Sequence, residues 1–177
     1  LMKILIIKTF PLSFEDWDNI GTLEREISIY KKIQETSNNE ISFFSFGGKS
    51  EKKYDSILKP LNFYYQKKKY HNRFIDIILS FLIPFNQNYA FKKTDIIQSN
   101  QFWGSWIGLI AAKLYKKKFI LREGFQFYEF QKKLNNNKII SLFILKIISK
   151  IIYNFSNIII VTSNEHRKYI VDKFKIN

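Results

Sequence analysis

Cysteine is absent from the 177-residue sequence, and histidine occurs only twice, as His71 and His166. Without cysteine the chain has no disulfide framework and no thiolate metal site, which fits a reducing compartment. Two histidines so far apart do not form a histidine-based metal site. We therefore expect neither a bound metal nor any other cofactor.

Arginine is also scarce. Only four of the 29 cationic residues are arginine, namely Arg25, Arg73, Arg122 and Arg167, although the net charge is +14. A charge of this size suggests nucleic acid or an anionic membrane as a partner. Proteins that read bases and phosphates depend on the forked guanidinium group, so the sequence argues against a nucleic-acid binder. Lysine is accompanied by much Ile, Asn, Phe and Tyr, which share adenine- and thymine-rich codons, so genome bias accounts for much of the charge.

Long uninterrupted apolar runs are absent too. Residues 139–161 form the longest apolar region, and Lys146 and Lys150 lie one helical turn apart within it. Such a polar stripe is typical of an amphipathic helix followed by a strand, and not of a membrane-spanning helix. The first apolar run, residues 4–7, is too short for a secretory signal. We expect a cytoplasmic protein, and leave open a peripheral contact with the inner face of the membrane.

Residues 95–124 organise the remaining chain. Two short apolar runs, residues 95–98 and 119–122, enclose a segment of helical periodicity, and a crossover of this length makes the two strands parallel neighbours. Each strand ends in polar residues or glycine. Because ligands bind at the carboxyl ends of strands in an open parallel sheet, we expect chemistry at this edge.

Further apolar runs predict strands at residues 3–7, 41–45 and 158–162. Helical periodicity predicts helices at 71–82, 139–155 and 164–174, and one that Thr22 caps. Residues 9–21 are expected to be a loop, 85–93 a connection, and 49–70 an irregular excursion. Residues 126–138 are polar, and a loop is expected at 135–137. The sequence therefore predicts one α/β domain over residues 1–177, with a doubly wound, mostly parallel Rossmann-like sheet and helices on both faces.

Five segments occur in an order seen in a known family. They are residues 2–7, 21–26, 95–99, 119–124 and 156–163, and the third is followed by an aromatic-rich helix. In this order and spacing the chain resembles the amino-terminal, acceptor-side domain of glycosyltransferase family four. These retaining enzymes of the GT-B fold have two facing Rossmann-like domains.

The resemblance implies sugar transfer from a nucleotide-sugar donor to a glycan or lipid-linked acceptor, in cell-surface polysaccharide synthesis. It also implies that most of the donor site belongs to a carboxyl-terminal domain outside these 177 residues. We therefore expect the chain alone to be inactive, and its own catalytic residues stay unknown.

The resemblance also assigns individual residues. Gly21 and Thr22 match the loop where the backbone approaches the donor phosphates, and Ile20 stands where the family usually has a first glycine. Gly21 alternatively only turns the chain into the helix. The acceptor side of the cleft is expected to contain Asn100, Gln101, Arg122, Glu123 and Gly124.

At Glu123 many relatives carry a histidine that faces the acceptor. A contact between the Glu123 carboxylate and an acceptor hydroxyl is therefore expected, and a solvated loop carboxylate is the alternative. Ser163 or Asn164 is expected to cap the last helix.

Two lysine clusters, residues 67–69 and 116–118, suit either phosphate or membrane binding, or are ordinary solvated faces. A peripheral membrane or scaffold module without catalysis thus remains the alternative to the acceptor domain.

Overall fold

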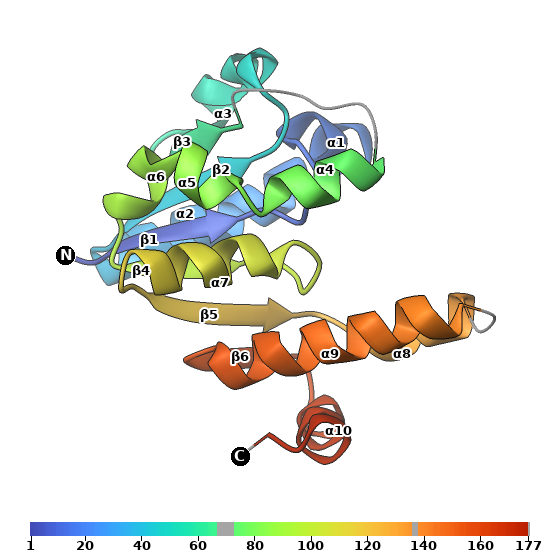
Figure 1. The fold of residues 1–177 in the computed structure, drawn as a ribbon. Coiled ribbons are helices and arrows are strands. Elements are labelled where there is room, and N and C mark those ends of the chain that lie inside the picture. The colour runs from blue at the N-terminus through green and yellow to red at the C-terminus, as the bar shows by residue number, and fades with distance from the viewer. Residues whose placement is uncertain (67–72, 136–137, 177) are drawn as a thin grey trace.

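The computed structural model describes residues 1–66, 73–135 and 138–176. Within these residues the chain forms a single six-stranded sheet with helices around it (Figure 1). Every pairing between neighbouring strands is parallel, and the strand order is β3-β2-β1-β4-β5-β6. The strands are β1 (Lys3–Ile7), β2 (Glu40–Ser45), β3 (Asn62–Tyr65), β4 (Ile96–Ser99), β5 (Lys118–Glu123) and β6 (Ile158–Val161). The predicted fold class, a doubly wound parallel sheet, is confirmed.

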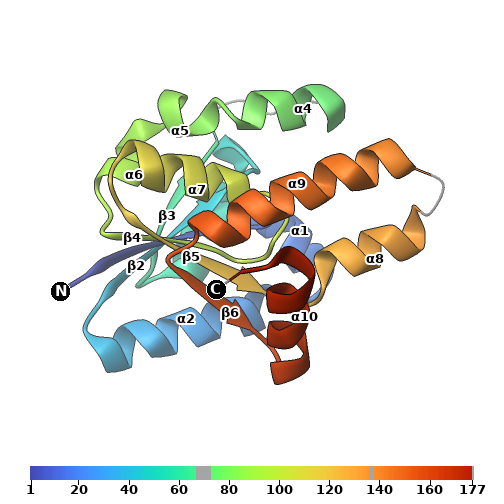
Figure 2. The ribbon, with the colours of Figure 1, turned by 60° about the horizontal axis from the view of Figure 1, so that its bottom comes forward.

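Helices cover both faces of the sheet, as Figure 2 shows. One face carries α2 (Leu23–Ser37), and the other carries α7 (Ser105–Leu114) and α9 (Ile139–Phe155). The last helix, α10 (Asn164–Phe174), packs beside β6 and α9. Each face has its own core, because successive side chains of a strand point in opposite directions. In β1, Leu5 and Ile7 enter the core under α7, and Ile6 enters the core under α2.

The excursion expected at residues 49–70 contains regular structure instead. It forms a 3₁₀ helix η1 (Lys49–Tyr54), a short helix α3 (Asp55–Leu58) and the edge strand β3. The prediction of five strands was therefore wrong by one. Strand β3 was not predicted because it has only four residues, and its three aromatic side chains are half-buried at the edge of the sheet. The cluster at 67–69 and His71 lie outside the described residues.

Two segments without a predicted helix are also partly helical. The expected loop at 9–21 contains α1 (Phe14–Asn19), which starts with a capping box between Ser13 and Asp16. The polar segment at 126–138 contains α8 (Phe127–Leu134), whose Phe127 and Tyr128 are buried. Of the loop expected at 135–137, residues 136 and 137 lie outside the described residues. The connection at 85–93 contains the end of α5 (Ile83–Asn86) and all of α6 (Asn88–Lys92). In the described residues, the helix expected at 71–82 is α4 (Arg73–Ser80).

Helix α2 begins at Leu23, as its periodicity predicts, but the expected cap is absent. No side-chain hydrogen bond caps the helix; the Thr22 hydroxyl instead donates to the carbonyl oxygen of Trp17, at 3.3 Å. By contrast, Ser163 caps α10 as expected, because its Oγ accepts a hydrogen bond from the backbone N–H of His166, at 3.1 Å.

Candidate functional site at the carboxyl edge of the sheet

The loops that leave β1, β4 and β5 meet at one edge of the sheet, because all three strands run in the same direction. Asn100 directly follows β4, and its backbone N–H donates to the carbonyl oxygen of Ile7, the last residue of β1, at 2.8 Å. Gly124 directly follows β5. The sheet therefore brings together the residues that the sequence assigned to the acceptor side of a cleft.

Arg122 and Asn100 form the centre of this edge. One guanidinium nitrogen of Arg122, Nη1, donates to the side-chain Oδ1 of Asn100 at 3.0 Å and to its carbonyl oxygen at 3.1 Å. The hydroxyl of Tyr30, from α2, approaches the same Oδ1 at 3.3 Å. Asn100 is buried and Arg122 is half-buried. Their geometry is thus fixed before any ligand binds.

Gly124 is held between the residues that follow β4 and β6. Its N–H donates to Oε1 of Gln101 at 2.9 Å, and its carbonyl oxygen accepts from the hydroxyl of Thr162 at 3.3 Å. A Cβ at this position would lie 3.0 Å from the amide nitrogen of Gln101, so a larger residue would displace that side chain. Glycine therefore leaves room for the side chain of Gln101 beside this residue.

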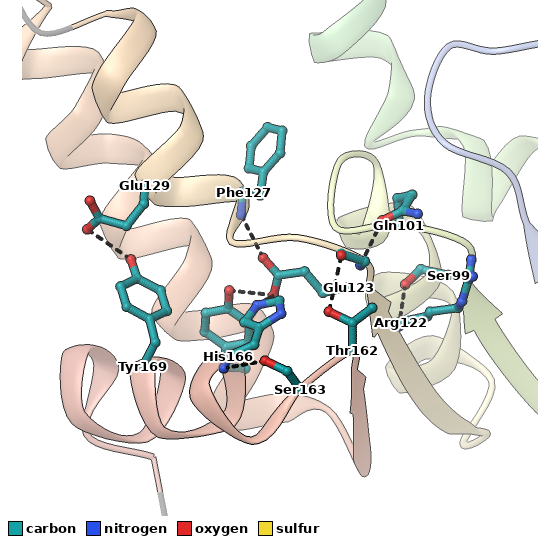
Figure 3. A network of polar contacts seen from close by, with 12 residues as sticks. Ser99, Gln101, Arg122, Glu123, Phe127, Glu129, Thr162, Ser163, His166 and Tyr169 are labelled. Atoms are coloured by element: carbon teal, nitrogen blue, oxygen red, sulfur yellow. Dashed lines mark hydrogen bonds and ion pairs between the residues drawn. The ribbon is translucent and has the colours of Figure 1, made fainter.

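Glu123 does not face solvent. Only 1% of its surface is exposed. Its Oε1 accepts from the N–H of Phe127 at 3.0 Å, and its Oε2 accepts from the hydroxyl of Tyr153 at 2.7 Å (Figure 3). The expected contact with an acceptor hydroxyl and the alternative of a solvated carboxylate are both wrong, because the carboxylate points into the core.

Burial controls the ionisation of this cluster. It raises the pKa of Glu123 to about 7, although the hydrogen bonds from Phe127 and Tyr153 act in the opposite direction. Nε2 of His166 lies 3.7 Å from Oε2 of Glu123 and has no hydrogen-bond partner among the described residues. Burial lowers the pKa of His166. The group holds α8, α9 and α10 on the end of β5, so its role is to position these helices.

Gly21 lies at the junction of α1 and α2, in the left-handed region with φ of +68°, and space is open around it. Helix α2 leads from β1 back to the start of the parallel strand β2, so its amino terminus lies at the carboxyl edge of the sheet. Gly21 and Gly124 therefore share this edge. The exposed backbone beside Gly21 and the helix amino terminus form a suitable environment for an anion.

Two hollows open at the same edge. One, of about 340 Å³, follows the ends of β1, β2 and β3 and includes Asp16, Gln66 and Asp76. The other, of about 730 Å³, lies between the loop after β1 and the helices α8 and α9. Neither hollow is evident from the sequence, since the walls come from α1, α4, α8, α9 and the residues that follow β1, β2 and β3. The pattern of Ser13 followed three residues later by Asp16 was the available signal for α1.

A second buried network, also missed, fixes the loop after β1. The amino nitrogen Nζ of Lys8 donates to the carbonyl oxygen of Ser13 at 2.7 Å and lies 3.3 Å from the ring centre of Trp17. Burial lowers the pKa of Lys8 to about 6. The carboxylate of Glu51 accepts from the hydroxyl of Ser45 at 2.8 Å, and also from the N–H of Phe14. These contacts join α1 to the ends of β1 and β2.

The described part of the chain has neither a cluster of metal-binding side chains nor a helix able to span a membrane. No three His, Asp or Glu side chains there are grouped so that they could hold an ion. No helix there has both the length and the apolar character needed to cross a bilayer.

No protein-family model matches the sequence, and no curated protein matches it. Solved structures, however, are similar over nearly the whole chain. A glycosyltransferase from Rickettsia africae matches 99% of it with a TM-score of 0.51 and 18% identity. MurG from Acinetobacter baumannii matches 94% with a TM-score of 0.53 and 10% identity. Anabaena Alr3699/HepE, solved with UDP and glucose, matches 98% with a TM-score of 0.55 and 14% identity.

These likenesses concern the fold. All three structures are glycosyltransferases of the GT-B type, and the matched part is 41% or 42% of each of their chains. The present chain thus spans about two fifths of the length of each, as one Rossmann-like half of a GT-B fold does. The resemblance to GT-B glycosyltransferases inferred from the sequence is confirmed at this level.

Proposed function

We propose that the chain is the acceptor-side domain of a retaining glycosyltransferase that transfers a sugar from a nucleotide-sugar donor to a glycan or lipid-linked acceptor, in cell-surface polysaccharide synthesis. The observation that carries this proposal is the likeness of nearly the whole chain to part of three GT-B glycosyltransferases, one of them solved with UDP and glucose. The parallel sheet and its carboxyl edge support the same assignment.

In this proposal the junction of α1 and α2 approaches the donor diphosphate. Gly21 leaves the backbone accessible, and the amino terminus of α2 provides N–H groups and a partial positive charge near Thr22. An exposed helix terminus contributes only about 0.3–1 kcal/mol, against the roughly 8 kcal/mol or more by which enzymes lower a barrier. A second, donor-binding domain is therefore required for transfer, because the field around the leaving diphosphate must be assembled from both sides.

The acceptor side would be formed by Asn100, Gln101, Arg122 and Gly124. The guanidinium of Arg122 retains donors beyond the nitrogen that contacts Asn100, and these can bind oxygen atoms of a sugar or a phosphate. Glu123 acts behind this surface by holding α8 and α9 in place.

Titration of the purified chain with UDP-glucose and UDP, followed by a transfer assay, tests the donor site. We expect weak binding and no turnover. Gly21→Val should weaken binding of the nucleotide further, since its side chain would crowd the phosphate site. Asn38→Val is the matched control: Asn38 also has a positive φ, of 51°, but follows α2 at its other end. Turnover by the chain alone, or equal effects of the two variants, would contradict the proposal.

A peripheral membrane module is the second candidate function. The specific observation in its favour is the outer face of α9, where large apolar side chains such as Ile140 and Phe143 are 78% and 64% exposed. Lys146 and Lys150 belong to the same helix. Co-sedimentation of the chain with anionic vesicles, combined with an absence of any nucleotide-sugar binding, would favour this module over the transferase domain.

A further inference from the structure

The larger hollow at the carboxyl edge is a groove of about 730 Å³ whose walls are mainly apolar. Its apolar lining comes from the loop after β1, α4, α8, α9 and the segment before α7: Phe10, Leu12, Ile77, Trp103, Phe127, Leu142, Ile144, Leu145 and Ile148. Polar groups are few, and include Thr9, Gln131 and Lys138. A volume in this range and such a lining are typical of a site for a small apolar ligand.

One end of the groove lies at the carboxyl edge of the sheet. Thr9 and Phe10 follow β1 after a single residue, and the N–H of Phe10 donates to the carbonyl oxygen of Trp103 at 3.3 Å. The ring of Trp103 stacks on that of Phe127, with 5.5 Å between their centres. These contacts fix the inner wall, so the groove has a defined shape next to the carboxyl edge.

The groove continues onto the outer face of α9. Apolar side chains that are 45–78% exposed recur there every three or four residues: Ile140, Ile144, Ile147, Ile151 and Phe155. Ile144 belongs to both surfaces, since it also lines the groove. An apolar ligand therefore has a continuous path from the outer face of α9 into the groove.

The charge around this path is positive. Residues 124–164 contain five lysines, at 132, 133, 138, 146 and 150, and a single acid, Glu129. That acid is already engaged, since Tyr169 donates to it at 3.1 Å and Lys173 lies 3.6 Å from it. A second copy would bring lysines against lysines, whereas an anionic bilayer is complementary to them.

We propose that this groove binds the hydrocarbon chain of a lipid-linked acceptor, which enters from an anionic bilayer along the outer face of α9. The inference rests on the proposed function and names its acceptor class. The chain of the lipid occupies the apolar walls, and its polar head lies toward Thr9 and the carboxyl edge. The sugar to be extended is then held beside Asn100 and Arg122 while the lipid tail stays out of water.

The first test uses dodecyl phosphate as the probe, kept monomeric below its micelle concentration, with the full 177-residue chain. Ile144→Glu puts a charge on the wall of the groove. Ile140→Glu makes the same change on the same helix, outside the groove lining, at a residue that is 78% exposed. We expect calorimetry to show about tenfold weaker binding for Ile144→Glu, and Ile140→Glu to bind as the wild type does.

A probe brominated on the chain carbons next to the phosphate adds a check in the wild-type chain, since Trp103 lies beside Phe10 at the end of the groove where the head is placed. The probe should quench tryptophan fluorescence, and the quenching should be weaker in Trp103→Phe, where Trp106 and Trp17 remain, while calorimetric binding persists. Equal effects of the two glutamate variants, or no binding of the probe, would overturn the proposal.

The second test separates the membrane from the groove. With phosphatidylcholine vesicles that contain phosphatidylglycerol, co-sedimentation should fall for Ile140→Glu and for the double change Lys146→Gln and Lys150→Gln. Binding of monomeric probe by these variants should stay unchanged. Because neither assay contains a nucleotide sugar, failure of donor binding leaves these results intact. If the chain binds UDP-glucose but does not bind the probe, only the proposal of a lipid-linked acceptor is refuted, and the proposed donor site stands.

Discussion

The hydroxyl of Tyr153 donates a 2.7 Å hydrogen bond to the carboxylate of Glu123 inside the protein core. Tyr153 belongs to α9 and Glu123 ends β5, so the bond fastens the helix to the sheet at the edge where ligands are expected. Both side chains are at least 99% buried. A buried carboxyl group depends on such donors, because water cannot replace them.

Removing this donor should destabilise the protein more than removing a comparable neutral contact. We expect Tyr153→Phe to lower the free energy of unfolding by about 1.5–3 kcal/mol, the range for hydrogen bonds to charged groups. Tyr115→Phe is the control, since the Tyr115 hydroxyl donates to the carbonyl oxygen of Pro84 at 2.7 Å. Tyr115→Phe should lower the free energy of unfolding by only about 0.5–1.5 kcal/mol, the range for hydrogen bonds between neutral groups. Urea unfolding measures both values, and a smaller loss for Tyr153→Phe would contradict the role assigned to the bond.

The raised pKa of Glu123 makes stability depend on pH. The carboxyl group has a pKa of about 7 in the folded state, against a reference value of 4.5. Between these values the folded state holds a proton that the unfolded state has released, so stability falls as pH rises from 4.5 to 7. His166 has the opposite effect on stability. Burial lowers its pKa, so the stability that the neutral imidazole contributes is lost as pH falls below about 6.5.

Glu123→Gln isolates the first effect, since it leaves His166, Tyr153 and the N–H of Phe127 in place. Near pH 5 the variant and the wild type should have similar stability. By pH 8 the variant should be the more stable, by up to about 3 kcal/mol, because a neutral amide replaces a buried charge. Urea unfolding at pH 5, 6, 7 and 8 checks this expectation. A difference that does not change with pH would show that Glu123 does not titrate in this range.

The sequence predicted five of the six strands because they are compact apolar runs such as residues 3–7, which parallel strands need when helices cover both faces of the sheet (Figure 2). Strand β3 has only four residues, Asn62–Tyr65, none of them buried, so it lacked that signal. Helix α8 was not predicted because only Phe127 and Tyr128 of its eight residues are buried.

The candidate site was predictable in position but not in orientation. Parallel strands place Asn100 and Gly124 at one edge whatever their side chains do. The direction of the Glu123 carboxylate depends on Tyr153 and His166, which are 30 and 43 positions further along the chain. No local pattern around residue 123 contains that information, and the same holds for the burial of Lys8 over Trp17.

Lys8 should weaken the fold at neutral pH. Its pKa is about 6 in the folded state and 10.5 as the reference, so between these values the unfolded state binds the extra proton. Stability therefore rises with pH across this window. Lys8→Met removes the dependence, so its stability relative to the wild type should be highest at or below pH 6 and decline as the pH rises toward 10.5. Lys52→Met, on the exposed surface, controls for the loss of one positive charge. A relative stability that rises with pH would contradict this interpretation.

We expect chains to associate through the outer edge of β6. Its four residues, Ile158–Val161, are all apolar, and Ile158 is 54% exposed. Within the described residues β6 pairs with β5 alone, and it has none of the lysine, proline or bulge that usually protects an edge strand. The 177-residue chain should therefore self-associate as its concentration rises.

Ile158→Lys should reduce the association at little cost in stability, because the lysine can reach solvent. Ile29→Lys is matched in charge and starts from a side chain that is 48% exposed on α2, away from the edge. Sedimentation velocity across a concentration series distinguishes the two, since only the change on β6 places a charge where a second strand would pair. Equal suppression by both variants would mean that net charge, and not the strand edge, controls the association.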